Sequence, residues 1–302
     1  MRRWKPAHLS LYIRHTSVMD IRELARDEFP AHLLETPYVP KRLWMRGAFP
    51  SAGTKYLAVV GSRALTSYGR EACNKLIEGL AGYPISIVSG LALGADAAAH
   101  RAALAAGLHT IAIPGSGLDD SVIAPRSNLG LAREILAAGG ALISEQEPLH
   151  VPRLAEFPSR NRIMVGLADA VLMIEAGERS GTLITARLAG DYNRELLTVP
   201  HRIGDPHGFG SHLFLRLGAT LVTHPLHILE SVRIPPRLEE EARPAIALTG
   251  NEKTLYELLQ EPKSTDDLLR LSLIAPGDAL TALATLELKG VLKEEFGVWR
   301  RA

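Results

Sequence analysis

Short turns rich in glycine and hydroxyl residues follow four apolar runs of this sequence. They are Gly61-Ser-Arg63, Ser89-Gly-Leu-Ala-Leu-Gly94-Ala-Asp96, Pro114-Gly-Ser-Gly-Leu-Asp119 and Gly177-Glu-Arg-Ser-Gly-Thr182. Glycine lets the backbone approach a ligand closely, and serine and threonine supply hydrogen-bond donors. A helix that begins at such a turn presents free N–H groups to an anion. One turn of this kind could serve packing alone, but four of them predict a phosphate- or nucleotide-binding edge.

A second stretch with ligand-binding side chains is Phe157-Pro-Ser-Arg160-Asn-Arg162, at the start of an apolar helix. The guanidinium of arginine matches the geometry of phosphate, and a phenylalanine ring offers a face on which a base can stack. We expect Arg160 to be exposed because it comes early in the turn, which makes it the better ligand candidate. Arg162 lies beside the apolar run and could instead pair with an acid such as Glu145 or Glu175.

Acids and histidines in and near these turns raise two further possibilities, a catalytic site and a metal site. The acids Asp96, Asp119, Glu145 and Glu175 could include a catalytic pair, although acids at strand ends commonly cap helices or hold arginines. Three histidines, His201, His207 and His212, share one glycine-rich loop, but their spacing matches no recognised metal-ligand pattern. The sequence contains neither the P-loop motif G-x-x-x-x-G-K-[ST] nor the G-x-S-x-G motif of esterases.

The elements that must position these turns are short apolar runs alternating with segments of helical spacing. The runs are Tyr56–Val60, Ile85–Ser89, Thr110–Ile113, Ala141–Ser144, Ala170–Glu175, Leu196–Val199 and Ala219–Thr223, and the helical segments include Arg70–Leu80, Ala95–Ala106, Leu129–Ala138 and Leu183–Tyr192. Continuous apolar strands separated by helices are typical of a parallel sheet covered on both faces. The pattern predicts a doubly wound, mostly parallel α/β domain over residues 51–232, with ligands beyond the carboxyl ends of its strands.

The remaining segments differ in texture from this domain. Residues 1–50 read as a short N-terminal extension, in which Asp20 to Leu34 could form an amphipathic helix. Residues 233–246 combine proline with charge and are typical of a linker. Residues 247–302 contain three helical segments and an alternating segment around Gly297, which together predict a small winged-helix domain. The helical segments are Glu252–Leu259, one starting at Ser264, and Pro276–Leu288.

Composition places the chain among ordinary globular proteins. Its 302 residues are 46% hydrophobic and 22% charged, and 34 Lys and Arg nearly balance 33 Asp and Glu. This balance argues against binding of nucleic acid through overall positive charge, but not against a local pocket with few cations. The single cysteine, Cys73, cannot form an intramolecular disulfide, which favours a reducing cytoplasm. The basic start lacks a continuous apolar stretch, so we expect no signal peptide. Charge-free runs such as Gly79 to Ala95 are interrupted by glycine and proline, so we expect no membrane span.

Several motifs, taken in order, resemble the DNA-processing protein A family, also called Smf. They are Gly61-Ser-Arg63, Ser89-Gly-Leu-Ala-x-Gly94-Ala-Asp96, Phe157-Pro-x-Arg-Asn-Arg-Ile163 and Ser180-Gly-Thr-Leu-x-Thr185-Ala, with Gly117-Leu-Asp119, Pro125, Asn128 and Leu131 between them. The resemblance implies an extended Rossmann fold that binds single-stranded DNA, forms a homodimer and loads the RecA recombinase during natural transformation. It also implies no turnover and no required cofactor, and single-strand-binding protein is a further candidate partner.

The same resemblance assigns the DNA-binding residues. Arg63 matches an arginine that contacts DNA phosphate, and Arg160 matches a basic position of the pocket. With the neighbouring motif positions, the predicted DNA-binding residues are Gly61, Ser62, Arg63, Gly90, Gly94, Phe157, Arg160, Asn161, Arg162, Ser180, Gly181 and Thr182. The sequence departs from the family at Ile123-Ala-Pro125, where Tyr-Pro is usual, and at His212, which replaces an asparagine.

Two alternatives remain open. A Rossmann-like nucleotide phosphoribohydrolase shares glycine-rich strand ends, but it normally carries Pro-Gly-Gly-x-Gly-Thr followed by Glu, where this chain has Pro114-Gly-Ser-Gly-Leu-Asp119. A transcription factor would sense a nucleotide and read duplex DNA through the winged helix. The segment Pro276–Leu288 carries Asp278 and Glu287 and no basic residue before Lys289, which favours a protein-contact or regulatory role for this domain over duplex reading.

Overall fold

The structure is a computed structural model that describes residues 21–153, 156–237, 248, 250–295 and 297–301. The chain divides into two compact units, with the boundary between Pro236 and Arg237. The expectations for residues 1–20, and for most of the linker 233–246, lie outside the described residues.

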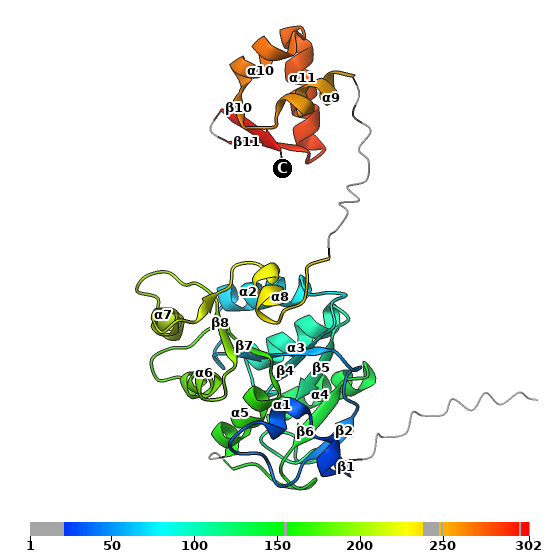
Figure 1. The fold of residues 1–302 in the computed structure, drawn as a ribbon, viewed down its shortest axis with the longest axis vertical. Helices are drawn as coiled ribbons and strands as arrows, with labels where there is room; N and C mark the ends of the chain where they lie inside the picture. Colours follow the sequence, from blue (N-terminus) through cyan, green and yellow to red (C-terminus); the bar gives the residue numbers. More distant parts are fainter. Residues whose placement is uncertain (1–20, 154–155, 238–247, 249, 296, 302) are drawn as a thin grey trace, which may run out of the picture. The chain divides into compact units, whose positions relative to one another are not determined.

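The described part of the first unit is built on one nine-stranded sheet, in the order β1-β2-β6-β5-β4-β3-β7-β8-β9 (Figure 1). The strands are β1 (Arg22–Glu23), β2 (Trp44–Gly47), β3 (Lys55–Val60), β4 (Ile85–Ser89), β5 (His109–Ala112), β6 (Ala141–Ser144), β7 (Ala170–Met173), β8 (Glu195–Thr198) and β9 (Thr220–Leu221). The pairs β1–β2 and β2–β6 are antiparallel, and the other pairs are parallel. The predicted Rossmann-like, mostly parallel α/β fold is confirmed.

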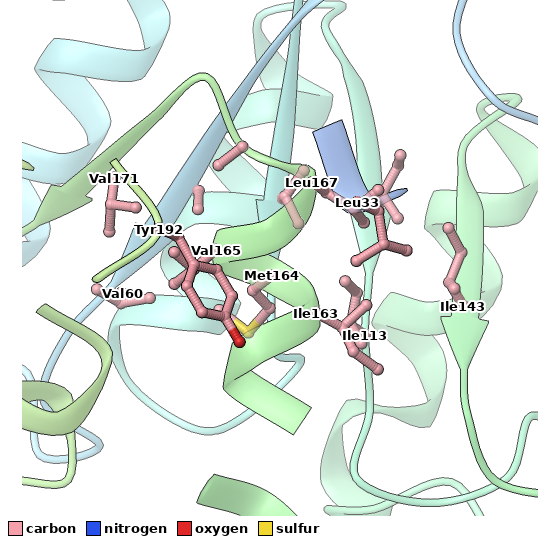
Figure 2. Packing of buried hydrophobic residues seen from close by; sticks show 14 of the residues in the cluster. Leu33, Val60, Ile113, Ile143, Ile163, Met164, Val165, Leu167, Val171 and Tyr192 are labelled. Carbon is pink, nitrogen blue, oxygen red and sulfur yellow. The ribbon is translucent and has the colours of Figure 1, made fainter. Parts of the chain in front are cut away.

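Helices cover both faces of this sheet because the strands alternate their apolar side chains between the two faces. They are α1 (Ala31–Leu34), α2 (Ser67–Glu78), α3 (Ala95–Ala105), α4 (Leu129–Ala137), α5 (Glu156–Leu167), α6 (Thr182–Asp191), α7 (Phe209–Arg216) and α8 (Pro225–Ser231). In β3, Ala58 and Val60 belong to the core cluster under α1, α5, α6 and α7, whereas Leu57 and Val59 belong to the cluster under α2, α3 and α8. Figure 2 shows part of the first cluster, to which Val60 of β3 and Val165 of α5 both belong.

The direction of winding reverses at β3. From β3 the chain adds β4, β5 and β6 toward one edge of the sheet, and it then returns to the other side of β3 to add β7, β8 and β9. The carboxyl ends of β3 and β7 therefore flank a topological switch point, where open α/β sheets leave a crevice for ligands.

The N-terminal region differs from the sequence prediction. The single helix expected from Asp20 to Leu34 is wrong: β1, a 3₁₀ turn at Arg26–Glu28 and the four-residue α1 occupy this segment. Pro30 is the N-cap residue that precedes α1, and it supplies no N–H for a longer helix that would run through it. Further along, β2 pairs with β6, so residues 21–50 contribute strands to the sheet.

The second unit contains three helices and a small sheet within its described residues. The helices are α9 (Gly250–Leu258), α10 (Thr265–Ser272) and α11 (Pro276–Leu288), and β10 (Lys263–Ser264), β11 (Leu292–Glu295) and β12 (Val298–Arg301) form a sheet in the order β10-β12-β11. Ser264 caps α10 by accepting a hydrogen bond from the backbone N–H of Asp267 at 3.1 Å. The elements follow the predicted order, and the winged-helix assignment itself stays a prediction. Among all described residues, no helix combines the length and apolar character needed to cross a bilayer.

Candidate functional site

A cavity of about 880 Å³ opens at the switch point. Its walls come from the turn after β3, the turn after β7 and the first turns of α5. Of the twelve residues predicted from sequence, nine line it: Gly61, Ser62, Arg63, Phe157, Arg160, Asn161, Ser180, Gly181 and Thr182. Segments more than a hundred residues apart in the chain thus meet in one cavity.

Arg63 and Phe157 form the part of the cavity best suited to a nucleic-acid strand. The guanidinium carbon of Arg63 lies 5.3 Å from the centre of the Phe157 ring, in a cation–π contact. Arg63 is exposed, and it has no ion pair within the described part of the chain. An unneutralised cation next to a half-buried aromatic ring can therefore contact a phosphate and a base together.

The opposite wall is the turn between β7 and α6. Ser180 Oγ accepts a hydrogen bond from the N–H of Thr182 at 3.2 Å and donates one to Thr182 Oγ1 at 2.9 Å, which fixes the start of α6 at the cavity. Arg179 lines this wall, is exposed and has no ion pair in the described residues. The sequence prediction omitted Arg179, although its place in the Gly177–Thr182 turn was a usable signal.

Arg160 lines the cavity but is not the exposed ligand that was predicted. Its side chain is buried, with 6% exposure, because α5 directs it under the sheet edge. Its Nη1 donates to the carbonyl oxygens of Gly90, at 2.5 Å, and Ile113, at the ends of β4 and β5. Its Nε donates to Asn161 Oδ1 at 3.1 Å. Arg160 therefore binds main-chain acceptors that the sheet leaves unpaired, and the expectation that it is exposed is wrong.

The positive charge of this buried arginine is balanced by Asp96, a buried residue that also lines the cavity. Burial lowers the pKa of Arg160 to about 10, whereas the carboxyl of Asp96 favours its charged form. Burial also raises the pKa of Asp96, against the opposing effect of Arg160 and a hydrogen bond from the N–H of Ala92 at 3.2 Å. The two groups stabilise each other through the field between them.

Gly90 and Gly94 lie outside the cavity lining and serve the backbone instead. A Cβ on Gly90 would lie 2.2 Å from Arg160 Nη1, so glycine is needed for the arginine to reach the carbonyl. Gly94 has φ of 74°, and a Cβ there would lie 2.2 Å from the carbonyl oxygen of Ser62. Both glycines shape the site without facing it, so the structure does not support them as direct ligand contacts.

Arg162 is also absent from the cavity. Residues 160 and 162 point to different sides of α5, and Arg162 pairs with Glu145 and donates to the carbonyl oxygen of Tyr38 at 2.5 Å. Pairing with Glu145, the alternative left open by the sequence, is what the structure shows. Arg162 therefore lies outside the cavity that Arg160 lines, because residues two positions apart face different sides of a helix, and its predicted role in DNA binding stays a prediction.

The acids considered as catalysts are held by structural contacts. The carboxylate of Glu175, which is fully buried, accepts hydrogen bonds from the backbone N–H of Thr66, at 3.0 Å, and from its hydroxyl. Asp119 accepts from the N–H and hydroxyl of Ser121. Glu175 thus neutralises the first turn of α2, which is why that helix start is not open to another anion.

The histidines of the loop after β8 also have structural partners. The Nε2 of His201 lies 3.0 Å from the carbonyl oxygen of Ile174, and the Nε2 of His212 lies 3.1 Å from the carbonyl oxygen of His201. His207 lines the cavity wall. No group of three metal-ligating side chains occurs among the described residues.

Known proteins match this chain over most of the first unit, and one relative matches into the second unit as well. The family model for DNA recombination-mediator protein A matches residues 21–233. Protein Smf of Escherichia coli is 45% identical over 206 residues, which make up 68% of this chain and 54% of that protein. The putative DNA processing protein DprA of Mycobacterium tuberculosis is 35% identical over 269 residues, 86% of this chain and 68% of that protein. The chain thus spans only about half the length of the Escherichia coli relative.

Solved structures agree with these matches. DNA processing protein A of Streptococcus pneumoniae superimposes with a TM-score of 0.65 and 36% identity, covering 70% of this chain and 75% of that one. DNA processing protein A of Helicobacter pylori, whose structure concerns a unique single-stranded DNA binding mode, gives a TM-score of 0.62 and 28% identity over 71% of this chain and 96% of that one. Family model, relatives and structures lead to one conclusion: the chain belongs to the DNA recombination-mediator protein A family.

Proposed function

We propose that this chain binds single-stranded DNA in the switch-point cavity and loads the RecA recombinase onto DNA that enters the cell in natural transformation. The observation that carries the proposal is the exposed Arg63, which lies over Phe157 without an acidic partner among the described residues. Single strands expose both phosphates and base faces, and a cation beside an aromatic ring can bind one of each.

Arg179 supports the same proposal from the opposite wall. With Arg63 it gives the cavity two exposed cations, and the N-terminal end of α6 adds the positive end of a helix dipole. The relative from Helicobacter pylori, for which a single-stranded DNA binding mode is described, belongs to the same family and shares the fold. A local site of this kind needs little overall charge, which fits a net charge of +1.

Binding without a covalent step fits the acids better than nucleotide hydrolysis does. Glu175 is bound to Thr66, and Asp96 is buried beside Arg160. A phosphoribohydrolase would need a carboxylate free to act on the bound nucleotide, and neither of these two is free; the exposed carboxylate among the described residues of the cavity lining is Glu178. We therefore propose a binding protein rather than an enzyme, working in the cytoplasm and without a cofactor.

The proposed homodimer would use the apolar surface around α7 and β9. Ile203 is fully exposed, Leu217 is 71% exposed, and Phe209 and Leu221 are partly exposed. Exposed apolar groups that gather in one region commonly mark a protein interface. Sedimentation velocity compares the molecular mass of wild type and Leu217→Glu. We expect a dimer for the wild type and a monomer for the variant, and the same mass for both proteins would exclude this surface.

Fluorescence anisotropy with labelled oligo-dT tests the DNA site. We expect Arg63→Ala and Arg179→Ala each to weaken binding and to reduce the slope of log K against log salt by about 0.7, the value for one phosphate contact on a single strand. Arg101→Ala is the matched control, because Arg101 is exposed on α3 outside the cavity. If the double variant R63A/R179A keeps wild-type affinity and slope, the site is misassigned; tighter binding to a duplex than to oligo-dT would favour a duplex reader.

A further inference from the structure

A second hollow, of about 680 Å³, lies at the same edge of the sheet as the switch-point cavity. It is lined by the segment from Pro37 to Arg42 together with Glu145 and Arg162. Glu145 directly follows β6, and β2 runs antiparallel to β6, so the residues that precede β2 lie beside the carboxyl end of β6. Topology therefore places both hollows where the parallel strands end.

Helix α5 contributes to both hollows. Arg160 lines the first, and Arg162, two residues further on, lines the second. Three strand spacings separate β3 from β6, on the order of 14 Å at ~4.8 Å between neighbouring strands. A few nucleotides of an extended strand can bridge this distance.

Tyr38 is the exposed aromatic group of the second hollow, with 71% of its surface exposed. The backbone around it is nevertheless held firmly. The carbonyl oxygen of Tyr38 accepts from Arg162 Nη1 at 2.5 Å, and that of Pro40 accepts from Arg26 Nη1 at 3.0 Å. Pro37 and Pro40 further restrict the segment. The fold thus orders a segment whose aromatic ring adds little to its core, and such a ring can receive a base at little entropic cost.

Of the basic residues that line the hollow, Lys41 is the one whose charge can contact a ligand. Arg162 is paired with Glu145, and Arg42 donates to Glu23 at 2.7 Å and to Glu147 at 3.0 Å. Lys41 is exposed and has no ion pair in the part of the chain that the structure describes. The hollow therefore offers one ring face and one unneutralised cation, the pair of contacts that one nucleotide needs.

We propose that Tyr38 and Lys41 form a second subsite for the same single strand, in which a base stacks on the Tyr38 ring and its phosphate contacts Lys41. The proposal rests on the proposed function of the first cavity. It extends the binding site along the sheet edge from β3 to β6, so the footprint on DNA is longer than the first cavity alone would give.

Oligo-dT of two lengths separates the two sites. The full chain is titrated with a dinucleotide, which is too short to span the roughly 14 Å between the hollows, and with a strand of about 16 nucleotides, at the upper end of known single-strand site sizes. Tyr38→Ala should weaken binding of the long strand about fivefold or more and leave the short strand unchanged, since stacking of one base is worth at least ~1 kcal/mol. Tyr38→Phe should keep wild-type affinity for both strands. Tyr68→Ala, an exposed tyrosine on α2 outside both hollows, is the matched control.

Photo-crosslinking gives a direct readout that a merely structural role would not produce. A long strand with 5-iododeoxyuridine should crosslink to Tyr38, as mapped by mass spectrometry. Equal loss of affinity for both lengths in Tyr38→Ala, no loss for either, or no crosslink at Tyr38 would each overturn the second subsite. Failure of the wild type to bind either strand would instead overturn the proposed function itself.

Discussion

Arginines at the edge of the sheet serve two different purposes. Arg63 and Arg179 are exposed and unpaired among the described residues, whereas Arg160 is buried on the carbonyl oxygens of Gly90 and Ile113. Sequence motifs treat these positions alike, because a motif records residue type and not the direction of a side chain. A substitution of Arg160 should therefore change the stability of the fold, so a loss of DNA binding in such a variant would not by itself show a direct contact.

Replacing Arg160 should lower the stability of the fold, and not only the affinity for the ligand. Arg160→Ala would leave two buried carbonyl oxygens and Asp96 without their partner, at a cost of about 3–5 kcal/mol of unfolding free energy. Urea unfolding followed by circular dichroism measures this, with Arg179→Ala as a control that stays near wild-type stability. Similar midpoints for both variants would contradict the structural role of Arg160.

At the scale of elements, the sequence predicts regular packing well and local departures poorly. The boundaries of Ile85–Ser89, Ala141–Ser144 and Pro276–Leu288 match the structure because uninterrupted apolar runs, turn residues and helix caps determine them. The antiparallel β2 escaped prediction because its four residues carry no periodic signal and are fixed by pairing with β6. Long-range pairing of this kind has no local signature.

The same limit applies to the site. The glycine-rich turns predicted the correct edge of the sheet, since topology requires all carboxyl ends of parallel strands to lie there. Which side of α5 each arginine faces depends on how the helix packs, so Arg160 and Arg162 could not be separated from the sequence. Neither could the role of Glu175, which is decided by its contact with Thr66 more than a hundred residues away.

The start of α2 offers a test of this contact. Glu175→Gln keeps the shape of the side chain but removes the negative charge from the helix N-terminus, which should cost about 1–2 kcal/mol of unfolding free energy. Glu178→Gln, an exposed carboxylate on the cavity wall, is the matched control and should leave stability unchanged. Chemical denaturation distinguishes the two, and equal midpoints would argue against an electrostatic role for Glu175.

At the scale of the whole molecule, a buried histidine links stability to pH. His100 is fully buried, and its Nδ1 lies 2.8 Å from Thr110 Oγ1, whose hydroxyl donates to the carbonyl oxygen of Ile87. Thr110 must then accept from Nδ1–H, which fits the neutral ring. Burial lowers the pKa of His100 to about 3, below its ordinary value of 6.5.

This lowered pKa makes the fold sensitive to acid. The contribution of His100 to stability is fully present above pH 6.5, where the unfolded chain is also neutral, and is lost as the pH falls from 6.5 toward 3. As the pH falls from 6 to 4, the unfolding free energy of the wild type should decrease by up to ~1.4 kcal/mol per pH unit more than that of His100→Asn. Urea midpoints across this range measure the difference, and parallel curves would show that His100 does not titrate with unfolding.

The two edge strands of the large sheet limit how the molecule can associate with other chains. The outermost strands, β1 and β9, have only two residues each. A long edge strand would present a row of unpaired backbone groups that could template the addition of strands from other chains. Within the described residues neither outermost strand is long enough to offer such a template, so the sheet is protected from edge-to-edge aggregation, and the proposed partners would have to contact side-chain surfaces.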